Sequence, residues 1–138
     1  MRRIRNRREQ RIRESGIQEI DMMNGIEFET YLTELYRGLG YIVTETKKSG
    51  DFGADLIIES GDQIVVIQAK RYKANVGVRA VQEVIAALSY YGADKGRVVT
   101  NSYFTSNAIE LAKRSDIELI DRDILITKIL KLKESNTS

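Results

Sequence analysis

The sequence predicts an α/β domain in which helices flank a mixed central sheet. Short apolar runs rich in β-branched residues, typical of strands, recur between residues 41 and 120. Apolar residues at helical spacing separate the later runs, which indicates strand–helix–strand crossovers. A tight Gly61-Asp62 turn joins two of the runs directly, and this adds an antiparallel hairpin to the parallel strands.

The elements follow in the order αβββαβαβα. The first helix covers about residues 25–38, where Phe28, Leu32 and Leu35 repeat at a spacing of three or four. Strands are expected at 41–43, 56–58 and 64–67, followed by a helix at 77–91, a strand at 97–100, a helix from about 105 or 106, a strand at 118–120 and a C-terminal helix capped by Asp121. An initial meander followed by strand–helix–strand crossovers describes a mixed central sheet flanked by helices.

Composition divides the chain into three parts. We expect residues 1–24 to form a basic, mobile N-terminal arm, residues 25–132 a single folded domain, and residues 133–138 a C-terminal tail. The arm is strongly positive because residues 1–13 contain seven arginines and one glutamate. Three roles for it stay open: a solvated tail or spacer, contact with DNA phosphates, and contact with an anionic membrane surface.

Composition also excludes several kinds of chemistry. The 138 residues include no cysteine and no histidine, which removes disulfides, thiolates, the usual zinc ligands and imidazole acid–base catalysis. A hydrolytic site must then use carboxylates, lysine, tyrosine or a metal bound by oxygen, for which Mg²⁺ or Mn²⁺ is the natural choice. No apolar run approaches the ~20 residues of a membrane span. We expect a cytoplasmic protein, with membrane contact through the arginine-rich arm, or membrane association of a longer form, as open alternatives.

The strongest candidate site lies on the predicted hairpin. Asp55 stands at the start of one strand, and Gln68 and Lys70 stand at the end of the next. A two-residue turn with glycine first suits type II′, and it pairs residue 58 with 65 and residue 55 with 68. Because side chains alternate between faces, this register places the three polar residues on one face, where they can hold a divalent metal and a lysine against a phosphodiester.

Two observations weigh on that interpretation. A register slip of one residue would move Asp55 to the other face, and a strand-end aspartate and lysine are often solvated or form an ordinary ion pair. The loop at 50–55 favours a site, because two glycines and two aspartates within six residues indicate a special backbone conformation.

These residues resemble a known family. Asp55 and the Gln68-Ala69-Lys70 run on consecutive strands are similar to the PD-(D/E)xK nuclease superfamily, and over about residues 24–127 the chain looks like an Mrr-type restriction endonuclease domain. The matching stretches are residues 25–29, 39–41, 49–55, 68–72, 80–84 and 99–105. The resemblance implies a Mg²⁺- or Mn²⁺-dependent DNA endonuclease of the restriction type, with modified DNA as a substrate. Cutting both strands of a duplex would favour a homodimer.

The resemblance also implies a role for each matching residue. Asp55 and Gln68 would bind the catalytic metal, with Gln68 standing where most relatives have a carboxylate. Lys70 would position the attacking water or stabilise charge in the transition state. Glu29, on the first helix, would supply the negative charge that Gln68 lacks; a solvated glutamate is the alternative.

Basic residues near the site are candidates for contact with DNA phosphates: Lys47, Lys48, Arg71, Lys73 and Arg79. Ordinary solubilising charge is the alternative for each of them. Asp51 and Gln82 lie in matching stretches but receive no definite role. Two further functions stay open on the same fold, a non-catalytic DNA-binding module and a nuclease for branched DNA that resembles Holliday junction resolvases.

Overall fold

The computed structural model describes residues 16–46 and 53–137. Its elements are α2 (Gly25–Gly38), β1 (Ile42–Glu45), β2 (Leu56–Ser60), β3 (Gln63–Lys70), α3 (Val78–Tyr91), β4 (Lys95–Thr100), α4 (Ser106–Ser115), β5 (Ile117–Ile120) and α5 (Arg122–Thr137). Residues 16–21 form a further helical segment ahead of α2. The predicted order of elements and the mixed α/β class are both confirmed.

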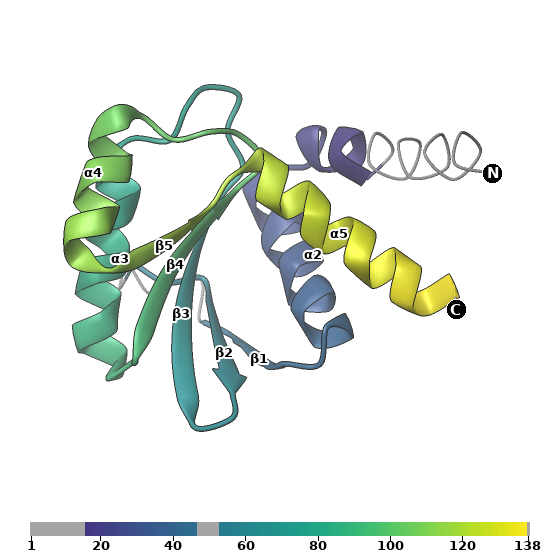
Figure 1. Ribbon diagram of the computed structural model, residues 1–138, viewed down its shortest axis with the longest axis horizontal. Coiled ribbons are helices and arrows are strands. Elements are labelled where there is room, and N and C mark those ends of the chain that lie inside the picture. The colour runs from purple at the N-terminus through teal and green to yellow at the C-terminus, as the bar shows by residue number, and fades with distance from the viewer. Residues whose placement is uncertain (1–15, 47–52, 138) are drawn as a thin grey trace.

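The five strands lie in the order β1-β2-β3-β4-β5. The pairs β1–β2 and β2–β3 are antiparallel, whereas β3–β4 and β4–β5 are parallel. Figure 1 shows α3 and α4 covering one face of the sheet and α2 and α5 covering the other. Because β2 runs opposite to β3, the start of β2 lies at the same edge of the sheet as the carboxyl ends of β3, β4 and β5.

The hairpin has the predicted register. Ser60 pairs with Gln63 and Ile58 pairs with Val65. Gly61 has a φ of 61° while Asp62 is not among the residues with positive φ, as a type II′ turn requires. The ladder ends at the pair of Leu56 with Ile67, so the next residue before β2 is the candidate aspartate at position 55.

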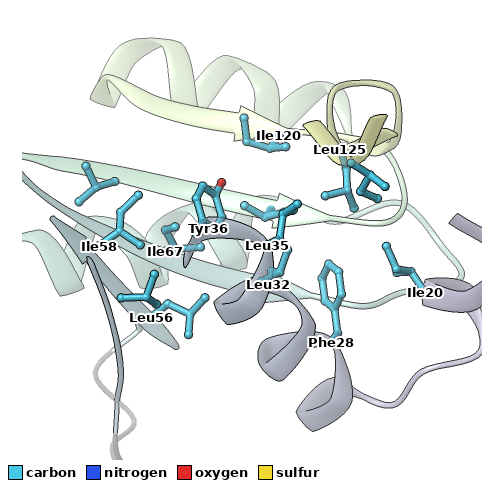
Figure 2. Close-up of a cluster of buried hydrophobic side chains, with 14 of the residues drawn as sticks. Ile20, Phe28, Leu32, Leu35, Tyr36, Leu56, Ile58, Ile67, Ile120 and Leu125 are labelled. Carbon is cyan, nitrogen blue, oxygen red and sulfur yellow. The ribbon is translucent and has the colours of Figure 1, made fainter. Parts of the chain in front are cut away.

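An apolar core fills each face of the sheet. The core drawn in Figure 2 joins the segment 16–21, α2, β2, β3 and α5, and it includes Ile20, Phe28, Leu32, Ile67 and Leu125. The core under α3 and α4 includes Val66, Val81, Val84, Val98 and Ala108. Since Val66 and Ile67 point to opposite faces, the strand alternation assigns Gln68 and Lys70 to the face that α3 covers.

The folded part of the chain begins before residue 25. Ile17 and Ile20 are 5% and 0% exposed in the core on the α2 face. Asp21 forms an ion pair with Arg122, with 2.8 Å between Oδ1 and Nη1. The sequence pattern missed this segment because six helical residues give less than two turns of periodicity.

The other boundaries are partly described. Helix α5 continues to Thr137, past the boundary predicted at residue 132. Residues 1–15, which carry most of the arginine-rich arm, lie outside the described residues. No helix within residues 16–46 and 53–137 is long and apolar enough to cross a membrane.

Candidate active site

Asp55 lies directly before β2, next to the last pair of the β2–β3 ladder, and its carboxylate takes the place of a backbone carbonyl as a hydrogen-bond acceptor. Its Oδ2 accepts a hydrogen bond from the Ala69 N–H at 2.8 Å, and its own N–H donates to the Ile67 carbonyl at 2.8 Å. Thr46 donates to the Asp55 carbonyl from its N–H at 3.0 Å and from its hydroxyl at 3.1 Å. These bonds hold the carboxylate beside β3, against the peptide between Gln68 and Lys70.

Burial raises the pKa of the Asp55 carboxyl above its ordinary value. Three contacts oppose that shift: the Ala69 N–H, a side-chain hydrogen bond with Glu29, and the charge of Lys70. The charge of Glu83 adds to it. Asp55 and Glu29 thus lie close together, and two neighbouring carboxylates repel each other unless a proton or a cation lies between them.

Glu83 on α3 joins the two polar residues at the end of β3. Gln68 is 7% exposed, and its Nε2 donates to Glu83 Oε2 at 2.5 Å. The Lys70 Nζ lies 3.2 Å from the same oxygen. Since Nε2 of the amide is engaged, its Oε1 is the atom that can bind a cation. Arg79 Nε lies 3.8 Å from Glu83 Oε1, but its side chain is 92% exposed, so this contact adds little.

A glycine brings the loop before β2 onto α3. Gly53 has a φ of 79°, and a Cβ at this position would lie 1.9 Å from the backbone carbonyl oxygen of Glu83. A side chain is therefore excluded on two grounds, the conformation and the space. The close approach keeps Glu83 beside Asp55.

Sequence reasoning did not identify Glu83 as a site residue, although a signal was present. Glu83 follows Ala80 by three residues and precedes Ala87 by four, and both alanines are buried. It therefore lies on the inward face of the helix, where an unpaired glutamate would be costly. A glutamate in such a position predicts a polar partner on the sheet.

The structure brings four of the predicted residues to one edge of the sheet: Glu29, Asp55, Gln68 and Lys70. Arg71 and Lys73 follow in the connection from β3 to α3, and Arg79 lies in the first turn of α3. Gln82 is exposed. Lys47, Lys48 and Asp51 lie outside the described residues. The roles assigned to these residues stay predictions.

The donor atoms at the site fit a hard cation. They are carboxylate and amide oxygens, the ligands that Mg²⁺ prefers. Among the described residues, no three acidic side chains gather into a group that could hold a metal unaided.

Comparison with known proteins identifies the class. The family model Mrr_cat, described as restriction endonuclease, matches residues 20–129. The chain therefore belongs to this restriction endonuclease family. The family supports a nuclease function, and its members generally use divalent metals.

Solved structures share the fold. The DNA modification-dependent restriction endonuclease AspBHI is 23% identical, with a TM-score of 0.65 over 94% of this chain and 36% of its own. The MspJI restriction endonuclease, in complex with a 27-mer oligonucleotide, is 21% identical, with a TM-score of 0.65 over 94% of this chain and 32% of its own. AF1548, a protein of unknown function, is 16% identical, with a TM-score of 0.59 over 67% of this chain and 55% of its own.

The chain thus spans about a third of the length of the two restriction enzymes. No curated protein matches it significantly.

Proposed function

We propose that this chain is a metal-dependent DNA endonuclease that hydrolyses phosphodiester bonds at the edge formed by Glu29, Asp55, Gln68 and Lys70. The observation that carries the proposal is the Asp55 carboxylate, which the Ala69 N–H holds beside β3 at 2.8 Å, between a buried amide and a lysine. Membership of the restriction endonuclease family supports it.

Asp55, Gln68 and Glu29 would hold Mg²⁺, with Mn²⁺ as a substitute. A divalent cation at this place supplies a Lewis acid for the phosphate and lowers the pKa of a bound water. Asp55 is the fixed ligand, because four hydrogen bonds hold its backbone and its carboxylate. The Glu29 side chain lies next to that of Asp55, so both carboxylates can face the same cation.

Lys70 supplies the positive charge that the phosphate needs. Its side chain is 19% exposed, and the Glu83 carboxylate at 3.2 Å fixes the direction of the ammonium group. There it can orient the attacking water or stabilise charge on the phosphate oxygens in the transition state. Water attacks phosphorus in line, the bond from phosphorus to the 3′ oxygen breaks, and that oxygen leaves. Glu83 acts as a positioning residue, since it holds Lys70 and Gln68.

The amide at position 68 matches the side chain that it meets on α3. Gln68 Nε2 donates to Glu83 Oε2 at 2.5 Å. A glutamate at position 68 would instead bring two carboxylates together, and their repulsion would separate them. An amide therefore suits this position, because its nitrogen donates to Glu83 and its oxygen can bind a cation.

DNA is the proposed partner. The fold is shared with MspJI, whose structure contains an oligonucleotide, and with AspBHI, which is described as modification-dependent. We infer the same substrate class, with modified DNA as the first choice. Lys47, Lys48, Arg71, Lys73 and Arg79 are the proposed phosphate contacts, and a homodimer would allow both strands to be cut.

The test is nicking of supercoiled plasmid, methylated and unmethylated, in Mg²⁺, in Mn²⁺ and in EDTA. We expect nicking in either metal and none in EDTA. Asp55→Ala should abolish it, whereas Asp62→Ala, an exposed aspartate in the turn at the far end of the hairpin, should not. Nicking in EDTA, or nicking by Asp55→Ala at the wild-type rate, would contradict the proposal.

A further inference from the structure

A pocket of about 420 Å³ opens beside the proposed catalytic residues. The helical segment 16–21 and the segments that follow β3, β4 and β5 form its wall, which includes Asp21, Arg71, Tyr72, Lys73, Tyr103 and Arg122. The chain leaves β3 and β4 toward the face covered by α3 and α4, but it leaves β5 toward α5 on the opposite face (Figure 1). Connections that diverge in this way open a crevice at the carboxyl edge of a sheet, where ligands of α/β proteins commonly bind.

The pocket continues the edge that carries Lys70. Arg71 and Tyr72 are the next two residues of the chain. The Thr100 hydroxyl donates to the Lys70 carbonyl at 2.6 Å, and the Tyr72 N–H donates to Asn101 Oδ1 at 2.8 Å. The wall of the pocket is thus hydrogen-bonded to the strand end that presents the lysine. A DNA strand bound at Lys70 can therefore extend to the pocket.

The wall of the pocket has more cationic side chains than acidic side chains, which suits an anion. Arg71, Lys73 and Arg122 face a single acidic side chain, Asp21. Arg122 holds that carboxylate with two bonds of 2.8 and 2.9 Å. Arg71 donates from Nη1 to the Asp21 carbonyl at 3.2 Å, while its buried Nε has no hydrogen-bond partner within the described residues. Three cationic side chains against one carboxylate leave the wall with a positive charge, which favours an anion.

Two tyrosines complete the pocket. Tyr72 and Tyr103 are 42% and 43% exposed. The Tyr103 hydroxyl donates to Asp123 Oδ1 at 2.9 Å, which fixes that ring in place. Exposed aromatic rings beside cationic groups are typical of sites that bind single-stranded nucleic acid, because bases stack on the rings and phosphates meet the cations. A site that binds only an anion does not need exposed aromatic rings.

We propose that this pocket binds one nucleotide of the DNA strand next to the phosphate that is cut. Arg71 and Lys73 bind its phosphate, and its base stacks on Tyr72 and Tyr103. The inference rests on the proposed nuclease function, since it is DNA lying over Lys70 that brings a nucleotide to the pocket.

The first test measures binding without cleavage. The probe is a fluorescein-labelled 12-nucleotide strand, in EDTA, followed by fluorescence anisotropy. Tyr72→Ala and Tyr103→Ala should each weaken binding about tenfold, within the range for one base stacked on an aromatic ring. Tyr103→Phe keeps the ring and should bind within about twofold of the wild type. Tyr90→Ala removes an exposed tyrosine in the last turn of α3, outside the pocket, and should change nothing.

The second test measures the phosphate contact through salt. Lys73→Ala should lower the slope of log K against log salt concentration by about one, whereas Lys131→Ala, an exposed lysine on α5 away from the pocket, should leave the slope unchanged. Thermal denaturation of each variant verifies that it is folded.

The outcomes separate the two proposals. Two results would overturn the proposal that the pocket binds a nucleotide. One is pocket variants that bind the strand as tightly as the wild type, and the other is a wild-type protein that does not bind the strand. A wild-type protein that binds through the pocket but never nicks plasmid would overturn the nuclease and leave the pocket standing.

Discussion

Replacing Glu83 by alanine removes the single acceptor that holds both Gln68 and Lys70. Gln68 is 7% exposed, so the loss leaves its Nε2 poorly solvated and unpaired, at a cost of about 1–3 kcal/mol. The ion pair adds only about 0.5 kcal/mol, because the Lys70 and Glu83 side chains are 19% and 31% exposed. The free energy of unfolding should therefore fall by about 2 kcal/mol, which lowers Tm by roughly 4–8 °C for a domain of this size.

Activity should fall further than stability does. Lys70 would lose the carboxylate that directs it, and a catalytic group misplaced by about 1 Å can lose about a hundredfold in rate. Single-turnover cleavage, measured well below Tm with saturating DNA, isolates this effect from folding. We expect a slower cleavage step with little change in DNA affinity.

Two variants serve as controls. Glu83→Gln keeps an acceptor for Gln68 but loses the charge that holds Lys70, so its stability should stay close to the wild type while its cleavage slows. Gln82→Ala changes the exposed neighbour on the same helix and should alter neither quantity. A Glu83→Ala protein with wild-type Tm and wild-type cleavage would refute the reasoning.

Three further predictions follow from the same contacts. Gly53→Ala should lower the free energy of unfolding by about 3 kcal/mol or more, because it combines a positive φ with a Cβ only 1.9 Å from a backbone oxygen. Gly25→Ala, with no atom within 4 Å of the added Cβ, should leave the free energy of unfolding unchanged. Chemical denaturation compares the two variants. Asp55→Asn should raise Tm at pH 7 while it abolishes cleavage. Because the pKa of Asp55 is raised in the folded state, ionisation of Asp55 lowers the stability of the wild type as pH rises from the unfolded-state pKa through the folded-state pKa. The gain in Tm from Asp55→Asn should therefore shrink as pH falls toward 3.8. A gain in Tm that is the same at every pH would contradict this cause. Ile20→Ala should cost about 2–5 kcal/mol in urea unfolding, since the side chain is 0% exposed, and an unchanged midpoint would show that the segment 16–21 is not part of the fold.

Most of the fold could be predicted because local rules agree with one another along the chain. Alternating apolar residues and a glycine at position 61 fix the register of the hairpin. The ladder ends at the pair of Leu56 with Ile67, and this brings Asp55 to the end of β3. Helices α2 and α3 show apolar stripes over several turns, so their predicted bounds were close to those observed. The end of α5 was predicted five residues too early, at residue 132 instead of Thr137. The segment 16–21 escaped because its length carries too little periodicity.

The site was only partly predictable because some of its contacts are tertiary. Glu83 reaches Gln68 and Lys70 because α3 packs across β3, and the depth of that packing depends on Gly53 touching the backbone of the helix. The spacing of Glu83 from the buried Ala80 and Ala87 places it on the inward face of α3, but it does not identify the residues of the sheet that Glu83 contacts. The Asp55 carboxylate also took an acceptor role for the Ala69 N–H, which strand alternation does not predict.

The central claim is that Lys70 and its neighbours cut DNA, and the rate of plasmid nicking in Mg²⁺ tests it most directly. The matched pair is Lys70→Ala and Lys95→Ala, since Lys95 is an exposed lysine at the opposite end of the parallel strands. We predict that Lys70→Ala slows nicking by about a hundredfold or more while Lys95→Ala nicks like the wild type. Equal rates for the two variants would contradict the account.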